Sequence, residues 1–467
     1  MFEPGNIGRG GSIQSRAADL RPIPAGFFAL ISIGTVLLWL PFSHREGHSI
    51  GFIDACFLSV SATCVTGLTP VNVAENFNLF GQAVLLILIQ LGGLGIFTAS
   101  ILLALVSGQK LSLADEHNIR ATVGKLRRVR TLDVFIYACL FIVIFEFAGA
   151  LAFFLRAVDA EVIDSEWIVL WESVFHSVSA FCNAGISIYP DGLAKWKDTP
   201  SILMIVNALV FTGGIGLMTL INLRYYYFWR RDQRLRGYLT LQTRLAIATS
   251  LILLAAGMVL TMILDWNGAL KGASFDQRLS WSFFHSTMSR TAGFNVVDTA
   301  AMKEPALLAT TFLMFIGGSP GSMAGGIKTV TFAILVTASW SAFRRRADVE
   351  IFGRRIPQQI AGTAVMLTLA ASAIVILGIG LLMFTEQNEP SIQTSHRWFG
   401  LVFEAVSAFG TVGLSAGVTP LLSSYGKIVI MLLMFVGRVA PLVLSLYLAR
   451  PAEVDRVRPP VEEVGLG

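Results

Sequence analysis

The chain has 467 residues, of which 54% are hydrophobic and only 14% are charged, and its formal net charge is +5. Because a soluble domain carries roughly 25% charged residues, this composition indicates a multi-span membrane protein. The four cysteines are scattered without a CxxC pair, which favours neither a disulfide framework nor a metal site. The positive charge predicts no nucleic-acid partner, since its distribution follows membrane topology instead.

Apolar segments follow one another in the order long, short, long, and this order occurs four times. The first long segments are residues 25–42, 132–157, 245–264 and 360–384. The short segments are residues 52–63, 167–181, 279–289 and 398–409. The second long segments are residues 79–106, 201–223, 305–343 and 424–449. The short segments have too few residues to cross about 30 Å of hydrocarbon, so they are re-entrant candidates.

Basic residues gather in the polar segments between and outside these groups. Such segments hold 23 of the 35 lysines and arginines and are residues 1–24, 108–130, 223–244, 344–355 and 450–467. An excess of Lys and Arg marks the cytoplasmic side of a membrane protein. The distribution therefore predicts that both termini and the three loops between the groups are cytoplasmic, and that the lipid bilayer surrounds the rest.

The pattern predicts an all-α polytopic membrane protein built from four pseudo-fourfold repeats. Each repeat is a span, a re-entrant pore helix, a filter loop and a second span, which gives eight transmembrane helices around one central pore. The predicted divisions are a cytoplasmic arm at 1–24, pore repeats at 25–107, 131–223, 243–343 and 358–449, and a cytoplasmic tail at 450–467.

A glycine-centred loop follows each short segment, and the loops recur about every 115 residues. A small hydroxyl residue precedes each glycine by six positions: Ser61, Ser179, Thr287 and Ser407. Non-helical backbone at membrane depth lines a cavity or is buried in protein, and four such loops can direct carbonyl oxygens at a dehydrated cation. The alternative, tight turns between helices, fits four loops in register less well. The candidate ion-binding residues are Val65, Thr66, Gly67, Asn183, Ala184, Gly185, Thr291, Ala292, Gly293, Thr411, Val412 and Gly413.

The second long segment of repeat 3 contains a stretch that cannot continue a regular helix, because it holds five glycines and a proline. The stretch is Gly317, Gly318, Ser319, Pro320, Gly321, Ser322, Met323, Ala324, Gly325 and Gly326, with Lys328 just beyond it. The other repeats hold a glycine pair or less there, so we expect the interruption in repeat 3 alone. Arg438 replaces the second glycine in repeat 4 and either projects into the pore, which we favour, or pairs with loop carbonyls.

Several polar residues lie next to the loops on the short segments. A cation aimed at the ion path would oppose conduction, so we expect Arg290 to point away and brace loop 3. Glu172, His176, His285 and Glu404 could form an acid/base pair, but hydrogen bonds to the backbone behind the filter fit their positions better.

Four runs resemble the filter loops of the Trk/Ktr/HKT superfamily of potassium transporters, most of all KtrB, the membrane subunit of Ktr systems. They are Val65-Thr66-Gly67-Leu68, Asn183-Ala184-Gly185, Arg290-Thr291-Ala292-Gly293-Phe294-Asn295 and Thr411-Val412-Gly413-Leu414. The resemblance implies potassium uptake across a bacterial plasma (inner) membrane through a channel-like selective pore, with K+ at the filter carbonyls. It also implies that the interrupted stretch, with Lys328 and Arg438, is the gate. Cys64, Cys182 and Ile186 depart from the family pattern, which bears on affinity rather than on ion class.

The resemblance further implies a homodimer that stands on a cytosolic ring of KtrA-like regulatory subunits. Nucleotide, ATP/ADP or NAD, is expected only on those partners, and Na+ is a candidate activator. No cofactor and no enzymatic activity are expected of this chain, because it offers no nucleophile–base or metal constellation. The alternative function is a carrier of another small cation or solute by alternating access, for which the sequence offers no central charged site besides Arg438.

Overall fold

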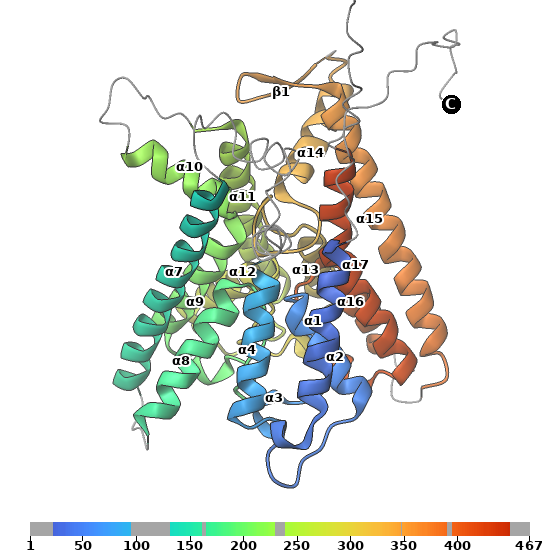
Figure 1. Ribbon diagram of the computed structural model, residues 1–467. Helices are drawn as coiled ribbons and strands as arrows, with labels where there is room; N and C mark the ends of the chain where they lie inside the picture. The colour runs from blue at the N-terminus through green and yellow to red at the C-terminus, as the bar shows by residue number, and fades with distance from the viewer. Residues whose placement is uncertain are drawn as a thin grey trace, which may run out of the picture.

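Helices make up most of the computed structural model, which describes residues 22–94, 131–160, 165–228, 239–346, 348–389 and 395–448. Nearly all of the expected cytoplasmic arm, the tail, the basic loop at 108–130 and the second half of the 79–106 segment lie outside the described residues. Figure 1 shows the helices gathered into one bundle around irregular segments at its centre.

Three sets of helices recur in chain order. The long outer helices are α1 (Pro22–Trp39), α7 (Thr131–Ala160), α11 (Leu241–Leu264) and α15 (Gln358–Thr385). The shorter helices before the glycine loops are α2 (Phe52–Thr63), α8 (Glu166–Phe181), α12 (Phe275–Met288) and α16 (Ser395–Gly410). The helices after the loops are α4 (Leu79–Gly93), α9 (Pro200–Ile215), α13 (Glu304–Phe315) and α17 (Ser424–Leu448).

Small elements connect these sets. The helical ones are α3 (Val73–Asn76), α10 (Leu217–Phe228) and α14 (Thr329–Phe343), with 3₁₀ turns at Pro41–Ser43, Ala194–Trp196, Thr299–Ala301 and Thr419–Leu421. Strands β1 (Val349–Ile351) and β2 (Arg354–Ile356) pair antiparallel with Val349 opposite Ile356. The hairpin packs through buried Ile356 near α14 and α15, at the end of the bundle where Figure 1 labels β1.

The helices meet their neighbours in a cyclic order. Each of α2, α8, α12 and α16 contacts the long helix that precedes it in the chain. Each also contacts a helix of the preceding repeat, in the pairs α4 with α8, α9 with α12, α13 with α16, and α17 with α2. The last pair joins the end of the described chain to its beginning, so the contacts form a closed circle.

Among the described residues, two of the second long segments are interrupted. In repeat 3, α13 ends at Phe315 and α14 begins at Thr329, as expected from the glycine-rich stretch. In repeat 2, α9 ends at Ile215 and Gly216 follows with φ +90° before α10 begins. The expectation of an interruption in repeat 3 alone is therefore wrong, because Gly216 adopts a backbone conformation that ends the helix. Figure 1 shows α10 leaving the bundle sideways.

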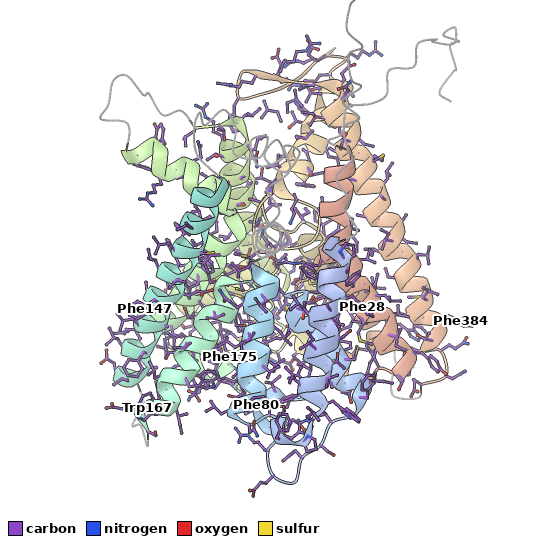
Figure 2. The ribbon with its side chains drawn as sticks, in the orientation of Figure 1. Phe28, Phe80, Phe147, Trp167, Phe175 and Phe384 are labelled. Carbon is purple, nitrogen blue, oxygen red and sulfur yellow. The ribbon has the colours of Figure 1, made fainter. Side chains whose placement is uncertain are left out.

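The outer surface is apolar, as lipid requires. Among the described residues, Cys139–Ala160, Leu241–Leu264 and Gln358–Thr385 are long and apolar enough to cross a membrane. Helix length alone thus identifies three of the eight expected spans. Figure 2 shows Phe147 and Phe384 on the outer faces of α7 and α15, where they are 69% and 70% exposed, whereas Phe175 of α8 is fully buried.

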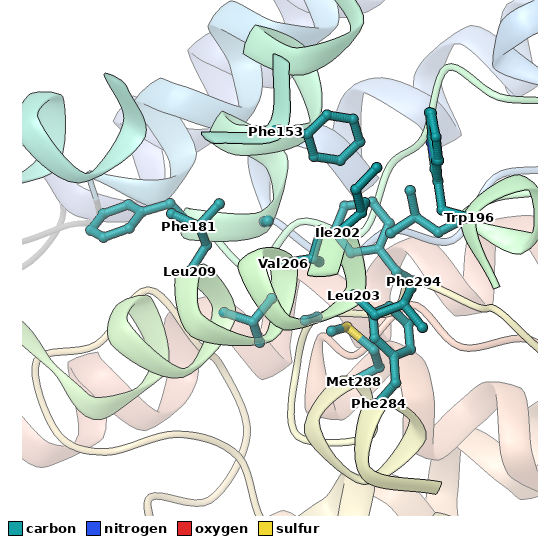
Figure 3. Close-up of a cluster of buried hydrophobic side chains, with 14 of the residues drawn as sticks. Phe153, Phe181, Trp196, Ile202, Leu203, Val206, Leu209, Phe284, Met288 and Phe294 are labelled. Carbon is teal, nitrogen blue, oxygen red and sulfur yellow. The ribbon is translucent and has the colours of Figure 1, made fainter. Parts of the chain in front are cut away.

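The largest buried cluster holds repeats 2 and 3 together. Figure 3 shows Phe153 of α7 and Trp196 beside residues of α9, and Phe284 of α12 near Phe294 of the third glycine loop. Phe153, Phe284 and Phe294 are each at most 1% exposed. A side chain immediately after a loop glycine is thereby fixed in the core, which restricts the loop itself.

Candidate functional site

The four glycine loops share one backbone conformation. The residue two positions before each glycine has positive φ, and so does the glycine itself. The first set is Val65, Asn183, Thr291 and Thr411, and the second is Gly67, Gly185, Gly293 and Gly413. Positive φ is uncommon outside glycine and genuinely unusual for a β-branched residue such as Val65. The repetition of this costly conformation indicates a role that a simple turn would not need.

The four glycines stand in a closed ring. A Cβ added to each would lie under 3.0 Å from the carbonyl oxygen of the residue before the glycine of a neighbouring loop. The pairs are Gly67 with Ala184, Gly185 with Ala292, Gly293 with Val412, and Gly413 with Thr66. Side chains are excluded at these positions both by φ and by space. Four backbone segments therefore converge where the sequence analysis expected ion-binding carbonyls.

Hydroxyl groups on the pore helices fasten three of the loops. Ser61 Oγ accepts a hydrogen bond from Gly67 N at 3.0 Å, and Ser407 Oγ accepts one from Gly413 N at 3.1 Å. Ser179 Oγ donates to Ile186 O at 2.8 Å. The serines six positions before the glycines thus hold the loops in place.

Loop 3 is held differently. Thr287, the fourth hydroxyl residue, donates to Phe283 O in its own helix. The amides of Ala292 and Gly293 instead donate to Met288 O, at 3.0 and 3.2 Å. Across the boundary to loop 2, the Asn183 side chain and Thr291 Oγ1 are 3.2 Å apart. Loop 3 therefore relies on its helix end and on its neighbour.

The interrupted stretch of repeat 3 folds into a hairpin-like loop next to the ring, on the side where α14 begins. Its two ends pair through Gly317 N to Ile327 O at 2.8 Å and Thr329 N to Gly318 O at 3.0 Å. We call residues 317–328 the gate loop. Its ends are fixed by backbone hydrogen bonds, so a change of shape would be concentrated in its middle.

The gate loop is anchored to repeat 2 at the break between α9 and α10. Ser319 N donates to Gly214 O at 2.9 Å, and Met323 N donates to Gly213 O at 3.2 Å. The carbonyls at a helix end lack intrahelical partners, so they are free to accept these bonds. This role could not be predicted from the sequence, because the Gly-Gly-Ile-Gly run at 213–216 has the same glycine pattern as the Gly-Gly-Leu-Gly run at 92–95.

The gate loop also contacts loop 4 of the ring. Gly325 N donates to Thr411 Oγ1 at 3.1 Å, and a Cβ on Gly325 would collide with the same side chain. Thr411 therefore presents its backbone to the ring and its hydroxyl to the gate loop. Thr66 stands one residue before its glycine and not two, and its Oγ1 is buried without a partner among the described residues.

Arg438 joins the gate loop to repeat 1. Its guanidinium donates to Met323 O and, at 2.9 Å, to Gly92 O, and the residue is 8% exposed. Of the two expected arrangements of Arg438, the structure has the less favoured one, in which the guanidinium pairs with carbonyls. Two carbonyl acceptors from opposite partners make Arg438 a clamp across the region below the ring.

Two more cations hold the ends of the gate loop, half-buried Lys328 within it and buried Arg290 beside it. Lys328 Nζ donates to Ala324 O at 2.6 Å, which folds the lysine back on its own loop. Arg290 donates to Ser250 O of α11 at 2.9 Å and to Gly317 O at 3.4 Å. Arg290 is therefore directed toward α11, and its guanidinium contacts the start of the gate loop, whereas the sequence predicted a brace of loop 3.

The polar residues on the short helices bond side-chain hydroxyls and backbone groups alike, since Glu404 also accepts from the backbone of Ala416 and Val418 and His176 contacts Glu172 O. Glu404 accepts from Ser415 and from Thr419 Oγ1 at 2.8 Å, and His176 contacts Ser187 Oγ at 2.9 Å. His285 contacts Thr310 of α13 at 3.0 Å. They form no acid/base pair, and no cluster of His, Cys, Asp or Glu suited to a metal occurs in the described ranges.

Comparison with known proteins places this geometry in a family. The family model described as TrkH, cation transport protein, matches residues 14–456. The chain is similar to the potassium/sodium uptake protein NtpJ of Enterococcus hirae, with 35% identity over 97% of this chain and 98% of that protein. It is also similar to the Ktr system potassium uptake protein B of Bacillus subtilis, with 36% identity over 95% of each chain.

A solved structure has the same fold. The crystal structure of the potassium transporter TrkH from Vibrio parahaemolyticus superimposes with a TM-score of 0.65 and covers 92% of this chain and 85% of its own. The two sequences are 18% identical, so this likeness concerns the fold alone.

Proposed function

The chain belongs to the TrkH family of cation transport proteins, and we propose that it takes up potassium through a channel-like pore as the membrane subunit of a Ktr-type system. The observation that carries the proposal is the closed ring of four glycine loops, each with the same two positive-φ residues. Relatives named as potassium uptake proteins match nearly the whole chain. The family consists of transporters and not of enzymes.

The ring would select ions with backbone carbonyls. A cation that loses its water needs oxygen ligands, and the carbonyls of the ring segments can supply them from four sides. The short helices end at the loops, so their partially negative C-terminal ends favour a cation there. The proposed filter residues are Val65, Thr66, Gly67, Asn183, Ala184, Gly185, Thr291, Ala292, Gly293, Thr411, Val412 and Gly413.

The membrane architecture of the proposal has eight spans and four re-entrant helices in four pseudo-fourfold repeats, with both termini in the cytoplasm of a bacterial cell. The cyclic helix contacts and the apolar outer surface support it. The excess of Lys and Arg in the loops between repeats supports the orientation. The repeat boundaries are the ones expected from the sequence.

The gate loop, Lys328 and Arg438 form the proposed gate. The loop lies under the ring and is held closed by Arg438 and by the carbonyls at the end of α9. Release of these bonds would let the middle of the loop leave the ion path. In this arrangement Arg438 acts mainly as a clamp, while its charge also opposes cations at the closed gate.

Regulation in the proposal comes from partners. Relatives of Ktr systems imply a complex with a regulatory subunit, which we propose to be a cytosolic KtrA-like ring that binds nucleotide under a homodimer of this chain. Sodium is proposed as an activator or second transported ion, since one relative is named a potassium/sodium uptake protein.

The test is ion uptake by the purified chain in proteoliposomes. Rubidium and sodium uptake are measured under a diffusion potential, which is worth about 2.3 kcal/mol per charge at 100 mV. Fast uptake that prefers rubidium over sodium is the expected result. Uptake without preference between the two ions, with and without the regulatory ring, would reject the proposal.

A further inference from the structure

Two of the four loops carry the same additional brace on their outer side. In loop 4, the Ser415 hydroxyl donates to Glu404, and Ser415 Oγ accepts from Gly417 N at 3.0 Å. In loop 2, Ser187 Oγ lies 2.9 Å from His176 Nε2 and accepts from Tyr189 N at 3.0 Å. Each serine stands two residues after its filter glycine, and each buried partner stands nine residues before the same glycine.

The chemistry of the two braces is the same although the residues differ. His176 Nδ1 lies 2.8 Å from the carbonyl oxygen of Glu172, which can only accept, so this nitrogen carries the proton. In the neutral ring Nε2 is then the nearer acceptor for the Ser187 hydroxyl, whose other acceptor, Gly192 O, lies at 3.4 Å. The imidazole nitrogen and the carboxyl oxygen therefore have the same role, which is to accept a hydrogen bond from a serine hydroxyl of the loop.

Both acceptors are fixed in place by further contacts. Glu404 is fully buried and also accepts from Thr419 Oγ1 at 2.8 Å. His176 is fully buried and stacks on Tyr189 at 4.4 Å between ring centroids. Its ring also meets Phe294, the residue after the glycine of loop 3, at 6.2 Å. His176 thus connects loop 2 with loop 3.

Loops 1 and 3 lack this brace. The corresponding positions on their pore helices are Leu58 and Phe284, both apolar and buried. Since the ring runs in chain order, loops 2 and 4 are not neighbours and face each other across it. Only the opposed loops 2 and 4 of the ring therefore carry this additional hydrogen bond.

We infer that His176 and Glu404 are positioning residues that fix the outer ends of loops 2 and 4 and thereby set the preference for potassium over sodium. The inference rests on the proposed function, because it needs the ring to be the filter. A smaller ion gains when opposite carbonyls can move inward, so two rigid, opposed loops suffice to disfavour sodium.

The experiment compares the ratio of rubidium to sodium uptake among variants in proteoliposomes. Glu404→Ala and Ser415→Ala each remove one side of the brace and should lower the ratio about tenfold, the effect of one buried hydrogen bond on an equilibrium. Glu404→Gln keeps an acceptor oxygen and should stay within about twofold of the unmodified chain. His176→Ala and Ser187→Ala should behave as the first pair does.

Matched controls exist in the same chain. His285→Gln changes a buried histidine of a pore helix that contacts Thr310 and no filter loop. Glu386→Gln changes a fully buried carboxylate that accepts from Ser423 at the outer end of α17. Both controls should leave the ratio unchanged, and His176→Gln is compared directly with His285→Gln.

The outcomes separate this inference from the proposed function. An unmodified chain that does not prefer rubidium rejects the proposed function itself. A selective unmodified chain whose Ser415→Ala and Ser187→Ala variants keep the same ratio overturns only the inference, and these two changes remove a single oxygen atom each. Variants that elute as folded protein but take up neither ion also count against it, since a positioning residue should change preference and not abolish passage.

Discussion

The glycine ring repeats one set of contacts four times, whereas the adjacent gate loop makes contacts that each occur once. The ring uses one backbone conformation four times, and each loop meets the next through the same glycine-to-carbonyl contact. The gate loop occurs once, and its partners come from the other three repeats: Gly92, Gly213, Thr411 and Arg438 each make a different contact with it or with its clamp.

The difference shows what each task requires. A dehydrated cation must be surrounded evenly, so the ring needs four equal segments. Closing a passage needs only one obstacle, so a single modified repeat is enough. A loop that is held by separate hydrogen bonds can also be released by a modest change in any of them, whereas a ring held by excluded volume has little freedom to move.

The largest effect should come from filling the ring. Gly67→Ser places a Cβ against Ala184 O at a φ of +101°, so loops 1 and 2 must separate. We expect the discrimination between rubidium and sodium in uptake to fall about 100-fold, or roughly 3 kcal/mol. Gly272→Ser is the control, because this exposed glycine has φ +84° with nothing within 4 Å. Equal selectivity of both variants would mean that the ring does not select.

Removing the clamp should be the next largest effect. Arg438→Ala removes two charge-assisted hydrogen bonds to carbonyls, so the closed gate loop loses stability. We expect rubidium uptake without partners to rise about tenfold. Arg438→Lys keeps the charge without the planar fork and should fall between the two. Uptake that is the same in all three proteins would remove Arg438 from gating.

A smaller effect should come from the link between ring and gate loop. Thr411→Val keeps the shape but takes away the acceptor of Gly325 N. Rubidium uptake should rise about fivefold, which corresponds to roughly 1 kcal/mol of lost stabilisation of the closed loop. In the control Thr311→Val, the lost hydroxyl bonds only its own helix, at Leu307 O. An equal rise in the two variants would argue against a specific link.

The smallest effect concerns how the circle of repeats closes. Lys427 of α17 pairs with Asp54 of α2 at 2.7 Å, and the side chains are 15% and 23% exposed. Lys427→Met should lower the free energy of unfolding by about 1 kcal/mol in detergent, seen as a lower Tm. High salt should reduce the difference. The exposed pair of Arg156 and Asp159 supplies the control, since Arg156→Met should change Tm little. A Tm unaffected by Lys427→Met would show that closure does not depend on this pair.

The sequence predicted the features that depend on repetition. Apolar length placed the four short helices, and the fourfold recurrence of glycine identified the loops, because each signal is local and appears four times. The resemblance that these loops suggested is confirmed by the family match over residues 14–456.

Features that depend on a single distant partner escaped prediction. The break at Gly216 follows a run that resembles its counterpart in repeat 1, and its reason lies in the gate loop about 100 residues later. Projection of Arg438 into the pore was the favoured expectation, and its carbonyl partners were not predicted, since only the folded chain brings Met323 and Gly92 together. The β1–β2 hairpin was not predicted, because its turn residues Phe352 and Gly353 both have positive φ, and Phe-Gly is not the Asn-Gly or Asp-Gly pair that signals such a turn.

The contact between Gly413 and Gly67 has a consequence for biosynthesis. It joins the first loop that leaves the ribosome to the last one, and only the contacts of Gly67 with Ala184 and of Gly185 with Ala292 can form before loop 4 is made. A chain that stops before residue 413 can fold three walls but cannot complete the passage. In the proposed function, selective conduction would therefore begin only when the final repeat meets the first.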